Sequence, residues 1–115
     1  MAFFEISTTK YEENIKLLQV AMTKMAAVCN VTVGFKFGDP VSRFGWTFFQ
    51  MLLDQELYVG IEDEFSDMIK KCKGNKPDEK FIKNKLGYYE VIEFCAKVKL
   101  FLVATLEPRL PPFFL

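Results

Sequence analysis

Three groups of acidic residues have the side chains that general acid–base catalysis uses, since two carboxyl groups at a fixed separation in a shielded pocket exchange protons with a substrate. The groups are Glu12-Glu13, Glu62-Asp63-Glu64 and Asp78-Glu79. Their members are adjacent in sequence and fall at the starts of expected helices, where acidic side chains interact favourably with the helix dipole. We therefore interpret them as helix-start residues and predict no catalytic residues.

The chain lacks most of the residues on which nucleophilic catalysis and metal binding usually depend. The chain has no histidine, which removes the commonest general base and the commonest metal ligand. The three cysteines, Cys29, Cys72 and Cys95, are far apart and form no Cys-x-x-Cys pair. No calcium loop or glycine-rich phosphate loop is present. We predict no cofactor, no metal site and no enzymatic activity. The cysteines are interpreted as free thiols in a reducing compartment, although a disulfide between two of them stays open.

The strongest electrostatic feature is a lysine cluster that follows an acidic stretch. Lysine plus arginine equals aspartate plus glutamate, 15 each, so the chain has no global field that would attract nucleic acid. A solvated surface accounts for the cluster without a partner. A partner for it is expected to be an acidic protein face, ahead of nucleic acid or anionic lipid, because the cluster contains only one aromatic residue for base stacking. Its candidate contact residues are Lys70, Lys71, Lys73, Lys76 and Lys80.

The apolar content is high for 115 residues, of which 50% are hydrophobic and 13 are phenylalanine. A domain of this size has limited interior volume. Two explanations for this content stay open. The phenylalanines could form a phenylalanine-rich core, or several aromatic side chains could reach a partner or an apolar ligand. The candidate partner-binding residues are Trp46, Phe48, Phe49, Leu110, Phe113, Phe114 and Leu115.

The clearest expected element is a helix over about residues 9–30. Apolar residues from Tyr11 to Cys29 recur at spacings of four and three, which places them on one helix face. Thr9 and Glu12 have the spacing of a capping box at its start. Residues 31–38 then alternate apolar and other residues with period two, which predicts an extended segment. With no second strand in view, it is either a loop packed on helices or a strand that pairs with another chain.

Further helices are expected after this segment. Asp39-Pro40 is typical of a helix start, and apolar spacing predicts a helix from there to Gly60, with Gly45 at a close backbone contact inside it. Helices at about 61–73, 77–86 and 88–106 follow. The prolines after residue 107 prevent a helix there, so residues 108–115 are expected to form an extended apolar tail in a groove of this domain or of a partner.

The predicted fold is therefore all-α: a four- to five-helix bundle over residues 1–107, with an extended segment at 31–38 and an extended tail at 108–115. The leading functional hypothesis is a non-catalytic accessory subunit or protein–protein interaction module, as a homo-oligomer or with another protein. The alternative is a helical-bundle protein that binds an apolar small molecule or lipid. No signal peptide or stretch of about 20 apolar residues is evident, so an intracellular protein in the cytoplasm or an organelle interior is expected, with peripheral membrane contact left open.

Overall fold

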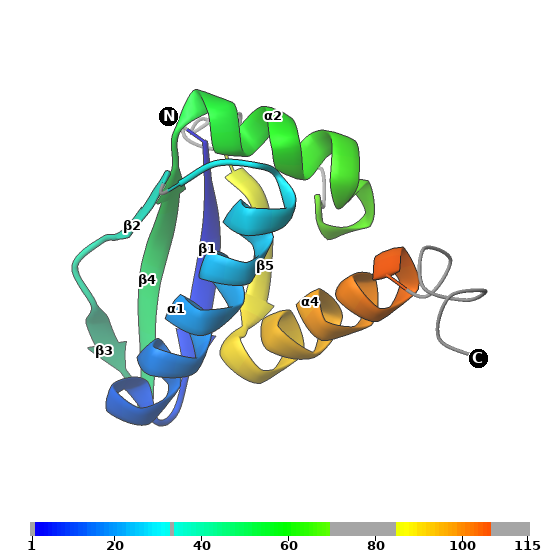
Figure 1. The fold of residues 1–115 in the computed structure, drawn as a ribbon. Helices are drawn as coiled ribbons and strands as arrows, with labels where there is room; N and C mark the ends of the chain where they lie inside the picture. The colour runs from blue at the N-terminus through cyan, green and yellow to red at the C-terminus, as the bar shows by residue number, and fades with distance from the viewer. Residues whose placement is uncertain (1, 33, 70–84, 107–115) are drawn as a thin grey trace.

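The computed structural model is a mixed α/β domain and describes residues 2–32, 34–69 and 85–106, with side chains described as far as residue 102 (Figure 1). The expected all-α bundle is wrong, because a five-stranded sheet forms the centre of the domain. The elements in chain order are β1 (Ala2–Thr8), α1 (Tyr11–Val28), β2 (Phe35–Phe37), β3 (Val41–Arg43), β4 (Trp46–Leu53), α2 (Gln55–Glu64), the 3-10 turn η1 (Ser66–Met68), β5 (Lys85–Glu90) and α4 (Val91–Leu106).

The sheet is mixed, with β1 at its centre. Its strand order is β2-β4-β1-β5, and β3 pairs with β4 beside β2. β4 pairs antiparallel with the whole length of β1, and Ile6 lies opposite Phe49. β5 is parallel to β1, and Ile6 lies opposite Tyr89. Helix α2 and the segment after it connect β4 to β5, which lies on the other side of β1 in the sheet.

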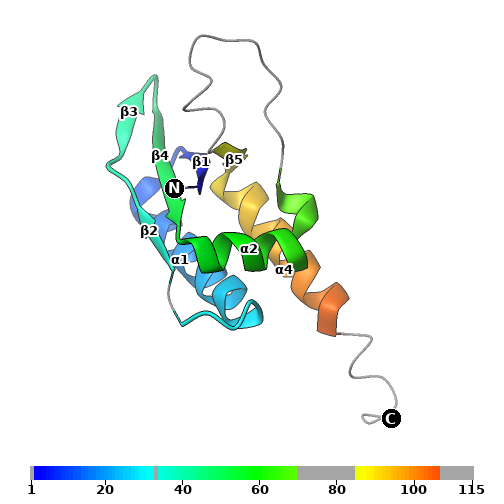
Figure 2. The same cartoon turned by 90° about the horizontal axis from the view of Figure 1, so that it is seen from above.

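Alternation along β1 gives the sheet two different faces. Phe4 and Ile6 are fully buried and belong to the hydrophobic core. Glu5 and Ser7 point to the opposite face, because successive side chains of a strand alternate. We call the face of Phe4 and Ile6 the inner face and the other the outer face. α1 and α4 pack on the inner face, and Figure 2 shows them on one side of β1 and β5.

The helix predicted from Asp39-Pro40 to Gly60 is wrong over most of its length. The hairpin β3–β4 occupies residues 41–53, and only residues 55–60 are helical, as the start of α2. Its apolar residues fit a helix by their spacings of three and four, but they also alternate with period two, which is the period the structure uses. Phe49, Met51 and Leu53 are buried in the core, and Phe48, Gln50 and Leu52 are half-buried on the outer face. A residue sequence this apolar on both faces satisfies either period, so spacing alone did not discriminate.

The turn of this hairpin is formed by Phe44 and Gly45, which have φ angles of 54° and 80°. Two consecutive residues with positive φ are the signature of the type I′ turn, whose twist matches the flanking strands. The expected close contact at Gly45 is therefore also wrong. A Cβ atom at this position would meet no atom within 4 Å, and glycine serves the backbone conformation.

The extended segment at 31–38 is confirmed in part as β2, but neither of the two expected packing modes holds. Phe35–Phe37 pairs antiparallel with Leu53–Met51 of β4, inside the same sheet. Its partner is β4, in the segment whose spacing predicts a helix. Gly38 N–H extends the pairing by donating to the Gln50 carbonyl oxygen at 2.7 Å.

The helix predicted at 9–30 is confirmed as α1, whose buried face includes Leu18, Met22 and Met25. The capping box is not formed, since the N-cap residue is Lys10 and no side chain caps the helix. Thr8 takes a related role instead. Its Oγ1 accepts a hydrogen bond from the Lys10 backbone N–H at 3.0 Å and donates one to Asn14 Oδ1 at 2.5 Å.

Gly60 lies inside α2 and does not end a helix, which corrects the expected boundary at that residue. A Cβ atom at Gly60 would lie 2.6 Å from Cys29 Cβ, so glycine allows α2 to approach the end of α1. Beyond α2, Phe65 and Met68 are fully buried. The helix predicted at 61–73 instead divides between α2 and η1, and its residues 70–73 lie outside the described part.

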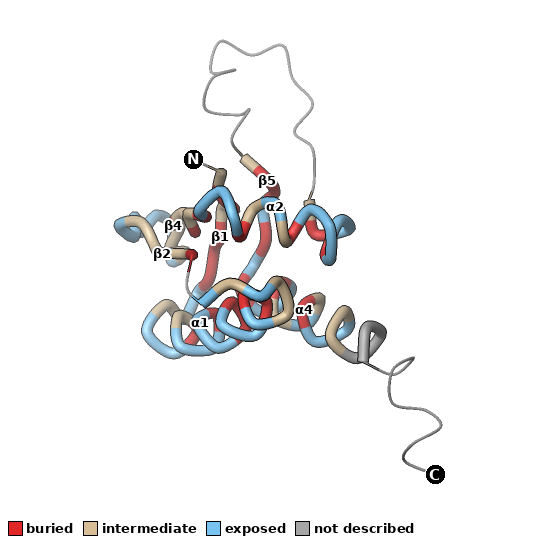
Figure 3. The backbone as a smooth tube through the Cα atoms, turned by 45° about the horizontal axis from the view of Figure 1, so that its top comes forward, coloured by how far each residue is buried: buried red, intermediate tan, exposed pale blue. Residues whose placement is uncertain are grey.

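The last predicted helix is confirmed as α4, with a later start at Val91, because Tyr88 to Glu90 belong to β5. Of the helix predicted at 77–86, residues 77–84 lie outside the described ranges, and Lys85 and Leu86 are in β5. Figure 3 shows buried residues along the strands and at intervals along α1 and α4, which is the pattern of helices with one face against a sheet.

Candidate functional site

The structure separates the predicted partner-binding residues of β4. Trp46 and Phe48 are half-buried on the outer face. Phe49 points the other way and is only 3% exposed, with its ring 5.4 Å from Tyr11 and 5.9 Å from Phe37 between ring centroids. Phe49 is thus a core residue.

The other predicted contact residues lie outside the described part of the chain. For the tail these are Leu110, Phe113, Phe114 and Leu115, and for the lysine cluster they are Lys70, Lys71, Lys73, Lys76 and Lys80.

An apolar surface surrounds Trp46 and Phe48 at the hairpin. Register pairs Val41 with Phe48 and Arg43 with Trp46, so these four side chains share the outer face. Phe44 extends the group at the tip, where it is 100% exposed. We call these five residues the aromatic hairpin surface. It combines tryptophan, arginine and phenylalanine on a two-stranded element, and tryptophan and arginine are enriched where protein interfaces gain most of their binding energy.

A polar row adjoins the aromatic hairpin surface at the centre of the outer face. Lys85 Nζ forms an ion pair with Glu5 Oε2 at 2.5 Å and lies 5.8 Å from the centroid of the Tyr88 ring. The hydroxyl groups of Ser7 and Tyr88 are 2.8 Å apart and share a hydrogen bond. These interactions link β1 to β5 on the outer face, beside the hairpin.

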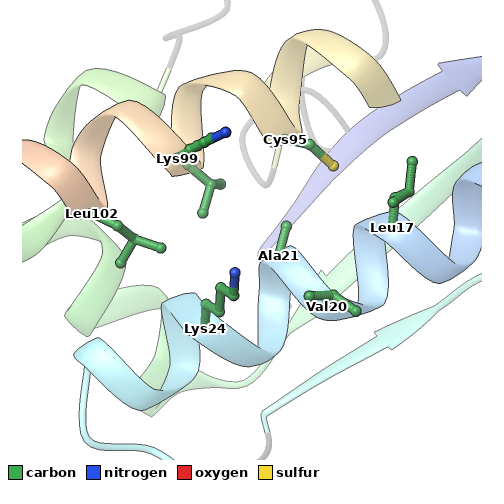
Figure 4. Close-up of a pocket in the computed structure, with 8 residues that line it drawn as sticks. Leu17, Val20, Ala21, Lys24, Cys95, Lys99 and Leu102 are labelled. Carbon is green, nitrogen blue, oxygen red and sulfur yellow. The ribbon is translucent and has the colours of Figure 1, made fainter.

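A second surface feature is an apolar groove of about 330 Å³ between α1 and α4, which we call the α1–α4 groove. Figure 4 shows the two helices side by side, with the Lys24 side chain directed from α1 toward α4 and the Cys95 sulfur directed toward α1. None of the described residues that line the groove is acidic. They are Leu17, Val20, Ala21, Lys24, Cys95, Val98, Lys99 and Leu102.

The groove has a closed floor and open walls. Ala21 and Val98 form the floor and are almost fully buried, whereas Leu17 and Val20 are each 54% exposed on one wall. Lys24 and Lys99 are exposed on opposite sides. Within the described residues neither lysine has an ion pair, so the groove combines an apolar lining with two ammonium groups that no described carboxylate pairs.

The two described cysteines, Cys29 and Cys95, are half-buried free thiols. Burial raises the pKa of Cys29 to about 11, with smaller contributions from Glu64 and Asp63, and burial also raises the pKa of Cys95. A raised pKa lowers the thiolate fraction and with it the nucleophilicity of the residue. Over the residues that the structure describes, no group of three or more histidine, cysteine, aspartate or glutamate side chains is placed to hold a metal ion.

Sequence reasoning missed Phe44, Val41 and Arg43 as surface residues, because it placed them in a helix. The available signal was Phe44-Gly45 between two runs that also alternate, since glycine after a turn residue is typical of a two-residue hairpin. Leu17 and Ala21 were identified only as residues that widen the apolar stripe of the first helix. Their role in a groove depends on α4, whose position no local pattern predicts.

No helix in residues 2–32, 34–69 and 85–106 has both the length and the apolar character that crossing a membrane requires. Comparison of the chain with protein-family models, with curated proteins and with solved structures finds no match in any of the three.

Proposed function

We propose that this protein is a non-catalytic interaction module or accessory subunit that docks on a protein partner through the aromatic hairpin surface. The single observation that carries the proposal is Phe44. Its side chain is fully exposed, and its backbone has a φ of 54°, which costs an L-residue roughly 1–2 kcal/mol. A single exposed phenylalanine needs no explanation. At a turn position with positive φ, however, asparagine or glycine would serve the fold better than phenylalanine does.

The neighbours of Phe44 support an interface. Arg43 and Trp46 are opposite each other in the register, directly behind the tip, and Val41 and Phe48 form the next pair. An aromatic tip with an arginine and a tryptophan behind it fits a partner that has an apolar pocket for the ring and polar groups around it. Pairing of β3 with β4 fixes the backbone behind the tip, so docking does not have to order these backbone segments.

We also propose that the protein acts without catalysis in a reducing intracellular compartment. The chain has no histidine. Cys29 and Cys95 lie on different elements as free thiols with raised pKa values, which fits structural cysteines better than nucleophiles. Nucleic acid is not part of the proposal, because the net charge is zero.

The test is affinity purification of the full chain from its own cells, with quantitative mass spectrometry of the co-purifying proteins. Phe44→Asn removes the ring and retains the turn, and Val59→Asn is the matched control because Val59 is an exposed apolar residue, 45% exposed, on α2. We expect one set of partners to be lost with Phe44→Asn and retained with Val59→Asn. The same partners with both variants and the wild type would contradict the proposal. Light scattering of the purified chain shows whether the partner is a second copy.

A further inference from the structure

We propose that the α1–α4 groove binds an amphipathic helix of a partner protein, with acidic residues on both sides of the apolar stripe of that helix. This inference goes beyond the proposed function, because the groove belongs to the helical layer on the inner side of the sheet and the aromatic hairpin surface lies on the outer face. The two surfaces can therefore be tested separately.

The spacing of the groove residues fits a helix. Leu17, Val20 and Lys24 follow one another on α1 at i, i+3 and i+7, and Cys95, Lys99 and Leu102 do so on α4 at i, i+4 and i+7. At 1.5 Å per residue each stripe is about 10 Å long, or two helical turns. A helix bound in a groove inserts anchors at i, i+3 or i+4, and i+7, which cover the same length.

The cross-section of the groove also fits this occupant. Ala21 is the smallest side chain in the lining and lies at the floor with Val98, so large apolar side chains from above have room between the walls. On the α1 wall of the groove, Leu17 and Val20 remain about half exposed. A third helix would bury these residues by packing ridges into grooves on α1 and α4 together.

Charge specifies which helix fits. Lys24 stands on the α1 side and Lys99 on the α4 side, and neither has an ion pair within the described residues. A helix between them brings its two flanks close to these ammonium groups, so carboxylates on both flanks would pair with the lysines.

The same charges disfavour a second copy of this chain as the occupant. A two-fold contact uses the same surface twice. It would bring four lysines into one interface, and among the described lining residues none is acidic to compensate them.

The test is selection from a displayed library of designed 18-residue helices that share a leucine stripe at i, i+3 and i+7 and vary in the charges flanking it. The target is the full chain. We expect helices with aspartate or glutamate on both flanks to be enriched. Selection on the Lys24→Glu/Lys99→Glu protein should instead enrich lysine and arginine flanks, because the electrostatic preference is reversed.

Fluorescence anisotropy with the best acidic helix then measures affinity. We expect about tenfold weaker binding to Lys24→Glu/Lys99→Glu, which corresponds to two exposed pairs changed from attraction to repulsion. The charge-matched control is Lys10→Glu/Lys36→Glu, at two exposed lysines outside the groove. It should bind as the wild type does, and so should Phe44→Asn, so that failure of the hairpin proposal leaves this result unaffected.

Three outcomes would overturn the inference. One is that no helix is enriched, or that helices are enriched regardless of flanking charge. Another is equal affinity for the groove variant and its control. The third is a lipid or other small apolar molecule that native mass spectrometry finds on the purified wild type and not on Val20→Glu, which would assign the groove to a small ligand.

Discussion

Replacing Phe44 with asparagine should make this protein more stable while removing a large apolar side chain. Phe44 and Gly45 form the two-residue turn between β3 and β4, with φ angles of 54° and 80°. Asparagine followed by glycine is the preferred pair for this turn, because asparagine tolerates the left-handed conformation better than phenylalanine does. The change therefore relieves backbone strain at the tip of the hairpin.

The expected gain follows from two terms. An L-residue loses roughly 1–2 kcal/mol in the left-handed region, and we expect asparagine to recover about 1 kcal/mol of it. The term that usually opposes such a change is absent, because the Phe44 side chain is 100% exposed and its removal leaves no cavity. A gain of 1 kcal/mol raises the Tm of a domain of this size by about 4 °C.

Urea unfolding is the suitable assay, and the chain contains its own probe. Trp46 is the only tryptophan and lies two residues from Phe44 in the same hairpin, so its fluorescence reports on this element while far-UV circular dichroism reports on the whole domain. We expect a higher midpoint with an unchanged m-value. Phe44→Ala is the control for loss of the ring alone and should change stability little, because alanine is also strained at this φ.

Gly45→Ala provides the opposite perturbation at the next residue. Its Cβ atom would meet no atom within 4 Å, so any loss of stability, which we expect at about 1–2 kcal/mol, comes from the backbone alone. The reasoning would be refuted if Phe44→Asn lowered the free energy of unfolding, since the ring would then have to stabilise the folded domain.

Three further predictions concern the interior. Gly60→Ala should destabilise the domain by about 1–2 kcal/mol, as measured by urea unfolding, because the new Cβ would lie 2.6 Å from Cys29 Cβ. This loss should exceed the gain from the better helix propensity of alanine. If the variant were as stable as the wild type, α2 would not lie so close to α1. Burial raises the pKa of Cys29 from 9.0 to about 11, so Cys29 should react with iodoacetamide at pH 8 about 100-fold more slowly in the folded protein than in urea. Cys95, whose pKa is also raised, should react slowly in the folded protein as well. Peptide mass spectrometry measures both rates, and equal rates in the folded and unfolded states would contradict the burial of these thiols. Burial, with Glu93 and Asp67, raises the pKa of Tyr89 to about 12 from 10.0, so the folded state holds this proton more tightly than the unfolded state: the resulting stability is complete below pH 10 and is lost as the pH rises through 12. Tyr89→Phe, which also removes the 2.8 Å hydrogen bond to the Met68 carbonyl oxygen, should unfold with a weaker dependence on pH in this range, and an unchanged dependence would assign the alkaline loss to other groups.

The elements that were predicted correctly are those with a single consistent period. The stripe from Tyr11 to Cys29 fits a helix and no strand, and α1 follows it closely. Most of α4 was predicted for the same reason, although β5 takes the first residues of the expected helix. Tyr88 and Tyr89 point to opposite sides of the sheet there, and the segment is held by its pairing with β1, which no local pattern shows.

The fold class was wrong because of two segments. Ala2–Thr8 is apolar on both faces at its start, Phe3 and Phe4 are both buried, and the segment was assigned to no element. Residues 46–53 satisfy the helical and the extended period together, and Pro40 favoured a helix start. A strand buried on one face and half-buried on the other lacks clean alternation, and only pairing between distant segments identifies it.

The sequence indicated some residues of the candidate site by type, but it could not indicate which side of the sheet each side chain faces. High apolar content predicted Trp46, Phe48 and Phe49 alike as partner contacts, but Trp46 and Phe48 lie on the outer face whereas Phe49 is in the core. One residue of offset along a strand reverses the direction of a side chain. The α1–α4 groove depends on the contact of two helices far apart in sequence, so composition could not place it.

The central position of β1 determines when this domain can be completed. β1 is synthesised before both of its neighbours in the sheet, β4 and β5. The hydrogen bond between Ser7 and Tyr88 joins residues 81 positions apart. Closing such a long loop slows folding, since entropy is lost before the contacts form. On the ribosome, β1 can pair with β4 early, but its other edge must wait for β5. During that interval the nascent chain presents an open strand edge, the structure through which chains aggregate, so slow elongation beyond β4 should favour chaperone binding at residues 2–8.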